Sequence, residues 1–193
     1  MAIFGSASEG FSQNNINCSI AESLERFKPL MERALEDGVP VRGYVSCVVE
    51  CPYDGMTKPD AVAGVAKALF DMGCYEISLG DTIGKAEPSE ITAMLDAVCE
   101  LVPAEKLAGH YHDTANRALA NIEVSLEKGV RTFDSAIGGL GGCPYAPGAK
   151  GNVETLAVFD RLNALGFETG IDRDQLIKAS ELLTEIMGKL NHD

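Results

Sequence analysis

The stretch YEISLGDTIGKAEPSEITAMLDAVCEL, residues 75–101, contains one complete strand–loop–helix pattern. Its first residues, Tyr75–Leu79, form a short run rich in apolar and β-favouring side chains, which is typical of a strand. The glycine-containing segment GDTIGKAEP follows, and from about Ser89 to Leu101 apolar residues recur at the spacing of an amphipathic helix. The stretch therefore predicts a βα unit.

The same pattern recurs along the chain with a period of roughly 30 residues, the length of a βα unit. Strands are expected at Ala2–Phe4, Val41–Val49, Tyr75–Leu79, Leu107–His112 and Arg131–Ile137. Helices are expected near residues 20–36, 58–72, 89–101, 114–128 and 153–165, with a last helix at 173–190. Ser19 and Glu22 form a capping-box pattern before the first of these helices. Strands that alternate with helices predict an α/β protein with a parallel sheet, whose functional loops lie at the carboxyl ends of the strands.

The number of units bears on how the sheet closes. A closed (β/α)8 barrel usually needs about 250 residues and eight units, whereas this chain has 193 residues and about five predicted units. Two interpretations remain at this point, an open sheet of its own kind or the C-terminal portion of a TIM-type barrel. No linker or low-complexity stretch divides residues 1–193, so we expect one domain.

Composition and charge narrow the classes of function. The net charge is −13 and no basic cluster is present, which argues against nucleic acid as a partner. No apolar run approaches the roughly 18–20 residues that span a bilayer, and we see no signal-peptide pattern, so we expect no membrane partner and a cytoplasmic location. The six cysteines include no C-x-x-C pair, which favours reduced thiols over a zinc cluster. The negative net charge is still compatible with a small anionic substrate, provided that glycine amides, helix N-termini, a metal or a few cationic side chains bind it.

The segment LAGHYHDT, residues 107–114, contains two histidines at the end of a predicted strand. Residues two apart on a strand point to the same face, so the imidazoles of His110 and His112 project together. They could form hydrogen bonds at the strand end, or they could offer two ligands to one divalent cation. Asn152 would add an oxygen donor, whereas Asp81 and Asp113 could instead cap the helices that follow them. Mixed nitrogen and oxygen ligands suit Mg²⁺ or Mn²⁺.

The loop GGLGGCPYAPGAKGN, residues 138–152, contains six glycines and one cysteine, Cys143. Glycines allow such a loop to fold closely over a ligand, and a nearby cation lowers the pKa of a thiol. We therefore interpret Cys143 as a thiol that exchanges protons near the metal. Cys51 lies in a similar CPY context and is the competing candidate. Simple packing is the expected role of Cys18, Cys47, Cys74 and Cys99.

The glycine-cysteine loop closely resembles the signature loop of the 3-hydroxy-3-methylglutaryl-CoA lyase family. The resemblance continues through NNINCSIAESLERF (14–27), VRGYVSCVVECPYDG (41–55), GCYEISLGDTIG (73–84) and GHYHDT (109–114), and so covers most of the chain. It implies a TIM-type (β/α)8 barrel of which this chain resembles only the C-terminal five or so βα units.

The resemblance also implies a reaction. Members of the family cleave the acyl-CoA substrate 3-hydroxy-3-methylglutaryl-CoA to acetyl-CoA and acetoacetate, in leucine degradation and ketone-body formation. By this resemblance His110, His112 and Asn152 bind Mg²⁺ or Mn²⁺, and Cys143 transfers a proton to the enolate of acetyl-CoA. Ser78 and Asp81 match positions that line the site, Ser78 towards the substrate and Asp81 among the catalytic groups.

One departure from the family pattern affects the expected activity. The family carries an Arg-Asp-Gly motif on its first barrel strand, and nothing in this sequence matches it, since the opening MAIFGSASEGF resembles the family from about its fourth strand onward. The absence of this motif matters for activity, because the loss of a single group that stabilises a developing oxyanion can lower the rate of the catalysed reaction by about 10²–10³-fold. The alternative expectation is therefore a non-catalytic relative that binds metal or acyl-CoA. Such a relative could also need a complementing fragment. For the chain in either case, we expect a homo-oligomer or pairing with a missing N-terminal segment as possible partners.

Overall fold

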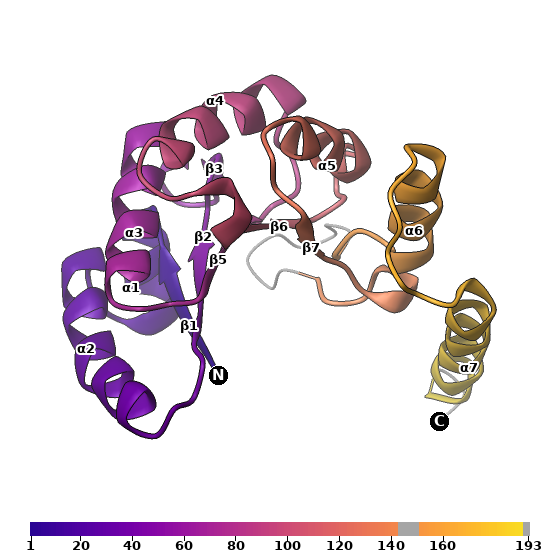
Figure 1. Ribbon diagram of the computed structural model, residues 1–193, viewed down its shortest axis with the longest axis horizontal. Helices are drawn as coiled ribbons and strands as arrows, with labels where there is room; N and C mark the ends of the chain where they lie inside the picture. The colour runs from indigo at the N-terminus through magenta and orange to yellow at the C-terminus, as the bar shows by residue number, and fades with distance from the viewer. Residues whose placement is uncertain (143–150, 191–193) are drawn as a thin grey trace.

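A parallel sheet of five strands organises the protein (Figure 1). The computed structural model describes residues 1–142 and 151–190. The strands are β1 (Ala2–Ser6), β2 (Arg42–Ser46), β5 (Glu76–Asp81), β6 (Leu107–Tyr111) and β7 (Thr132–Asp134). They lie in the order β1-β2-β5-β6-β7, and each neighbouring pair is parallel. The predicted α/β class and parallel sheet are confirmed.

Helices follow the strands in sequence. They are α1 (Glu9–Ile16), α2 (Ile20–Glu36), α3 (Pro59–Asp71), α4 (Pro88–Cys99), α5 (Ala118–Glu127), α6 (Thr155–Ala164) and α7 (Arg173–Leu190). Helices α2 to α6 form an arc outside the strands, so one face of the sheet packs on helices and the other lies on the concave side (Figure 1). The predicted capping box is confirmed, because the side chain of Ser19 accepts the Glu22 N–H and the Glu22 side chain accepts the Ser19 N–H. None of the helices in the described residues has the length and apolarity that crossing a bilayer requires.

Three elements differ from the prediction, and one is the last strand, which was expected at Arg131–Ile137 and spans only Thr132–Asp134. No helix was predicted between the first strand and residue 20, but the residues after β1 form the short helix α1, which Ser8 caps by accepting the N–H of Phe11. The predicted strand Val41–Val49 ends at Ser46, where Cys47 takes a positive φ of 59°. A small antiparallel hairpin of β3 (Glu50–Cys51) and β4 (Gly55–Met56) follows. A positive φ is costly for a residue other than glycine, and a hydrophobic pattern does not reveal it.

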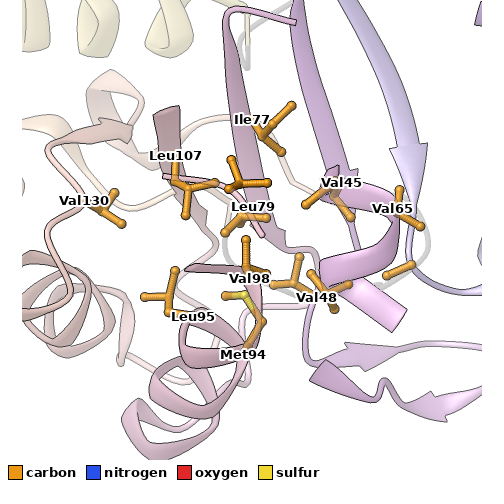
Figure 2. Packing of buried hydrophobic residues seen from close by; sticks show 14 of the residues in the cluster. Val45, Val48, Val65, Ile77, Leu79, Met94, Leu95, Val98, Leu107 and Val130 are labelled. Atoms are coloured by element: carbon orange, nitrogen blue, oxygen red, sulfur yellow. The ribbon is translucent and has the colours of Figure 1, made fainter. Parts of the chain in front are cut away.

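The hydrophobic core lies between the sheet and its helices (Figure 2). Val45, Ile77 and Leu79 alternate along β2 and β5 toward the helices, as the period of two requires. Met94 and Leu95 of α4 pack against them and are at most 1% exposed. Each such side chain contributes about 1.5–3 kcal/mol on burial. This packing fixes the strands and so the residues that point the other way.

The concave face of the sheet is polar, in contrast to the core. It presents Arg42, Tyr44, Glu76, Ser78, His110 and Asp134, all of which alternate with the core-facing residues of their strands. The parallel registers set Tyr44 beside Ser78 and His110 beside Asp134. Charged groups gathered on the inside of a curved sheet are the feature that calls for a functional explanation.

Candidate functional site

Two imidazoles lie side by side at the carboxyl end of β6. The ring centroids of His110 and His112 are 5.5 Å apart, which confirms the expectation that both project to the same face. His112 is buried, whereas His110 is partly exposed. Burial, with a further contribution from the neighbouring His110, lowers the pKa of His112 to about 4. His112 is therefore neutral near pH 7, the form in which an imidazole binds a metal.

Asn152 reaches the same place from the other side of the glycine-rich loop. Its backbone forms an antiparallel bridge with His112. The Val153 N–H donates to the Tyr111 carbonyl at 3.2 Å, and the Asp113 N–H donates to the Gly151 carbonyl at 3.0 Å. These bonds hold the segment after the loop against the end of β6. The Asn152 amide nitrogen donates to the Leu140 carbonyl at 2.9 Å, which fixes the orientation of the amide.

The residues present fit a divalent cation. Nδ1 of His112 and Oδ1 of Asn152 are buried, and neither has a hydrogen-bond partner within residues 1–142 and 151–190. Buried polar atoms without a partner are costly, and a bound cation would satisfy both. No group of three His, Cys, Asp or Glu side chains with metal-binding geometry occurs in that part of the chain. The candidate set therefore depends on the amide oxygen, a hard donor that suits Mg²⁺ or Mn²⁺.

Asp134 on β7 lies beside His110 at the centre of a network of charges. Its Oδ2 is 3.0 Å from Nδ1 of His110, and Arg42 donates to both of its carboxylate oxygens, at 2.7 and 2.9 Å. Arg42 also donates from Nε to Glu76 at 2.7 Å and lies over the ring of Tyr44. Burial opposes the charged form of Asp134, but the bonds from His110 and Arg42 outweigh it and lower the pKa to about 2. Asp134 is therefore a carboxylate at neutral pH.

Sequence reasoning missed Arg42 and Asp134. The available signal was their position: each is a charged residue inside or at the start of a strand-like run, where the neighbouring side chains pack in the core. Such a residue must face the other side of the sheet and find a partner there. The alternation gives the face but does not show which residue is the partner.

Ser78 and Asp81 lie on opposite faces of β5, although the sequence analysis placed both at the site. Ser78 is buried on the concave face and donates to Oδ2 of Asp134 at 2.9 Å. Asp81 is 1% exposed and its carboxylate accepts the N–H groups of Gly84 at 3.1 Å and Ala86 at 3.0 Å. Burial raises its pKa although these bonds oppose the shift. The structure thus gives Asp81 the role of holding the loop after β5, and a direct part in the chemistry stays a prediction.

The position of Cys143 lies outside the described residues. The competing thiol, Cys51, is buried in a small cluster with Phe11 and Cys47. Its sulfur accepts the Ser8 hydroxyl at 2.8 Å and the backbone N–H groups of Tyr53 and Asp54 at 3.3 and 3.4 Å. Cys51 therefore serves the folding of its own loop. Packing is confirmed for the thiols expected to be structural, which are buried at Cys18, Cys47 and Cys74 and partly buried at Cys99.

A cavity of about 100 Å³ adjoins the two histidines on the concave face. Its lining residues are Phe4, Tyr44, Val45, Ser46, Gly80, Thr82, His110 and His112. A larger cavity of about 390 Å³ lies among β7, α5 and α6, where Phe133 and Phe159 contribute to an apolar wall. No histidine lines that larger cavity. The two candidate metal-binding histidines therefore line the smaller cavity and not the larger one.

The fold and site define an α/β protein with a parallel sheet and a polar site at the carboxyl ends of its strands. The HMGL-like family matches residues 1–183, and the chain belongs to this family. The chain is 56% identical over 191 residues to the mitochondrial hydroxymethylglutaryl-CoA lyase of Arabidopsis thaliana, covering 99% of this chain and 41% of the relative.

Solved structures agree with this assignment. The HMG-CoA lyase of Brucella melitensis superposes with a TM-score of 0.93 at 61% identity, over 96% of this chain and 65% of that one. An HMG-CoA lyase from Acinetobacter baumannii, in complex with coenzyme A and 3-methylmalate, gives a TM-score of 0.90 at 33% identity, over 97% of this chain and 61% of that one. The chain thus spans less than two thirds of the length of these proteins.

Proposed function

We propose that this chain supplies the metal-binding part of a carbon–carbon lyase that acts on 3-hydroxy-3-methylglutaryl-CoA. The observation that carries the proposal is the convergence of His110, His112 and Asn152, where buried donor atoms of His112 and Asn152 lack partners in the described ranges. Membership of the HMGL-like family supports the substrate class. The relative solved with coenzyme A supports an acyl-CoA as ligand.

The proposed reaction breaks one carbon–carbon bond. The C3 hydroxyl of the substrate loses its proton, the C2–C3 bond breaks, and its electron pair stays with C2 of the departing acetyl-CoA. C2 then gains a proton and acetoacetate is the second product. A bound Mg²⁺ or Mn²⁺ supplies positive charge that polarises the substrate oxygens.

The side chains of the site have separate roles in this proposal. His110, His112 and Asn152 bind the cation, and the low pKa of His112 keeps its imidazole neutral for this purpose. Cys143 is the thiol assigned to proton transfer, from the resemblance of its loop. Ser78 faces the same side of the sheet as His110 and is the proposed contact to substrate, whereas Asp81 positions the loop that follows β5.

A coupled assay of acetoacetate release tests the proposal. With Mn²⁺ or Mg²⁺ present, we expect turnover, and we expect Cys143→Ser to lower kcat by about 10²-fold or more while Mn²⁺ affinity stays unchanged. Cys51→Ser is the matched control, because Cys51 lies in the same CPY context, and it should retain activity. Equal losses from the two variants would show that the thiol has been assigned wrongly.

A second candidate function follows from the length of the match. The chain spans 41–65% of the three relatives above, and within the described residues β1 and β7 each pair with only one strand of the sheet. A protein that binds cation and acyl-CoA without cleaving it, or that needs a complementing segment, would fit these facts. Binding of Mn²⁺ and coenzyme A without acetoacetate release would favour this candidate. Absence of Mn²⁺ binding would contradict both.

A further inference from the structure

The carboxylate of Asp134 joins residues from three strands of the concave face. Its Oδ2 lies 3.0 Å from Nδ1 of His110 on β6 and accepts the Ser78 hydroxyl of β5 at 2.9 Å. Arg42 of β2 places one guanidinium nitrogen between the two carboxylate oxygens. Because Asp134 is an ionised carboxylate, it is the acceptor in each of these interactions.

This arrangement determines where the proton of a neutral His110 lies. An ionised carboxylate can accept hydrogen bonds but cannot donate them, so Nδ1 of His110 must carry the proton that the pair shares. The other ring nitrogen, Nε2, then keeps its lone pair. A neutral imidazole binds a metal through its unprotonated nitrogen, and a carboxylate on the opposite nitrogen is a recurring way to fix that form.

Arg42 keeps the carboxylate in this orientation. The Arg42 side chain is 12% exposed and is itself fixed by Glu76, by the Tyr44 hydroxyl and by stacking over the Tyr44 ring. β2 and β7 are three strand spacings apart, roughly 14 Å, so the contact exists only because the sheet curves and the arginine is long. Such a defined partner makes rotation of the Asp134 carboxylate costly.

We propose that Asp134 and Arg42 are positioning residues that select the Nδ1-protonated tautomer of His110 and leave its Nε2 free for a divalent cation. That His110 binds a cation through Nε2 rests on the proposed function. The tautomer itself depends only on contacts within this chain.

Asp134→Asn makes a sharp test because it changes donors and acceptors at nearly constant shape. Arg42 can only donate and its shorter bond is to Oδ1, so we expect the carbonyl oxygen of the introduced amide to take the Oδ1 position. The amide nitrogen then points to His110 and donates to Nδ1. We therefore expect the tautomer to reverse, with the proton on Nε2.

The experiment is ¹⁵N NMR of metal-free protein labelled at histidine, at pH about 8, above the ordinary histidine pKa of about 6.5. We expect a protonated Nδ1 for His110 in the wild-type protein and a protonated Nε2 in Asp134→Asn. Mn²⁺ affinity should fall about 10–100-fold in the variant. Asp160→Asn is the control, since Asp160 pairs with Arg173 on the protein surface and should change neither readout.

Three outcomes test the role of Asp134 in setting the tautomer of His110. A wild-type His110 with its proton on Nε2 would overturn the inference, and this measurement does not depend on whether the variant folds. An unchanged tautomer in a folded Asp134→Asn protein would also overturn it. The expected tautomers in a protein that fails to bind Mn²⁺ would support the positioning role and contradict the proposed function.

Discussion

His112 and Asn152 form an antiparallel backbone bridge that places the end of a strand beside the segment after the glycine-rich loop. The bridge brings a buried imidazole nitrogen and a buried amide oxygen to the same region, and both lack partners within the described residues. Because the backbones are paired, the two residues cannot move apart without breaking hydrogen bonds around the bridge. The bridge therefore fixes the backbone of two of the three proposed cation ligands.

Removal of the amide oxygen should weaken cation binding. Asn152→Ala leaves the backbone bridge in place but deletes the only oxygen donor of the candidate set, so we expect Mn²⁺ affinity to fall at least about tenfold, or about 1.4 kcal/mol. Electron paramagnetic resonance of free Mn²⁺ measures this directly. Asn163→Ala is the control, since the Asn163 amide only contacts the Phe159 carbonyl on an exposed helix. Unchanged Mn²⁺ affinity in Asn152→Ala would exclude Asn152 as a ligand.

Gly84 should tolerate no side chain. It has a φ of 67°, and a Cβ there would lie 2.8 Å from the backbone of His112. Gly38 has a φ of 66° with open space around it. An alanine at position 38 would therefore be strained by its positive φ but would meet no steric clash. We expect Gly84→Ala to lower the free energy of unfolding in urea by about 1–3 kcal/mol more than Gly38→Ala. Equal losses would mean that the loop moves away from His112 at no cost.

Loss of the Asp81 carboxylate should loosen the loop after β5. Asp81→Ala leaves the Ala86 N–H without its acceptor, whereas the Gly84 N–H keeps its bond to the Asp81 backbone carbonyl at 3.2 Å. We expect hydrogen exchange at the Ala86 amide to quicken at least tenfold, about 1.4 kcal/mol of local stability, and exchange at the Gly84 amide to quicken by a smaller factor. Asp113→Ala is the control, because Asp113 accepts the N–H of Ala118 instead. Its effect should appear at Ala118 and spare Gly84 and Ala86, and any other pattern would contradict the role given to Asp81.

Stability at alkaline pH should depend on Cys74. Burial raises the pKa of its thiol to about 11, from an ordinary value near 9. Between these values the unfolded chain loses the proton while the folded protein keeps it, so the free energy of unfolding falls as pH rises. We expect Cys74→Ala to remove a decrease on the order of 2 kcal/mol from the wild-type curve between about pH 9 and 11. Urea unfolding across this range measures it, and parallel curves would refute the assignment.

Local patterns predicted most of the elements. The helix Ile20–Glu36 has the predicted bounds, because a capping box is a short-range signal. The pair His110 and His112 shares a face because alternation along a strand is a property of the backbone alone. The helix α1 and the hairpin after Ser46 were missed, since they depend on a cap and a positive φ that have no hydrophobic period.

Local sequence patterns did not predict contacts between residues that are far apart in the sequence. Alternation shows that Arg42 and Asp134 face the same side of the sheet, but their contact depends on the order of four strands and on the curvature of the sheet. The sequence by itself determined the fold class, the pair of histidines and the family resemblance, because these follow from short-range geometry and recognisable motifs. Only the tertiary structure decided that Asp81 holds a loop while Asp134 contacts His110, because hydrogen-bond partners are chosen by packing across the sheet.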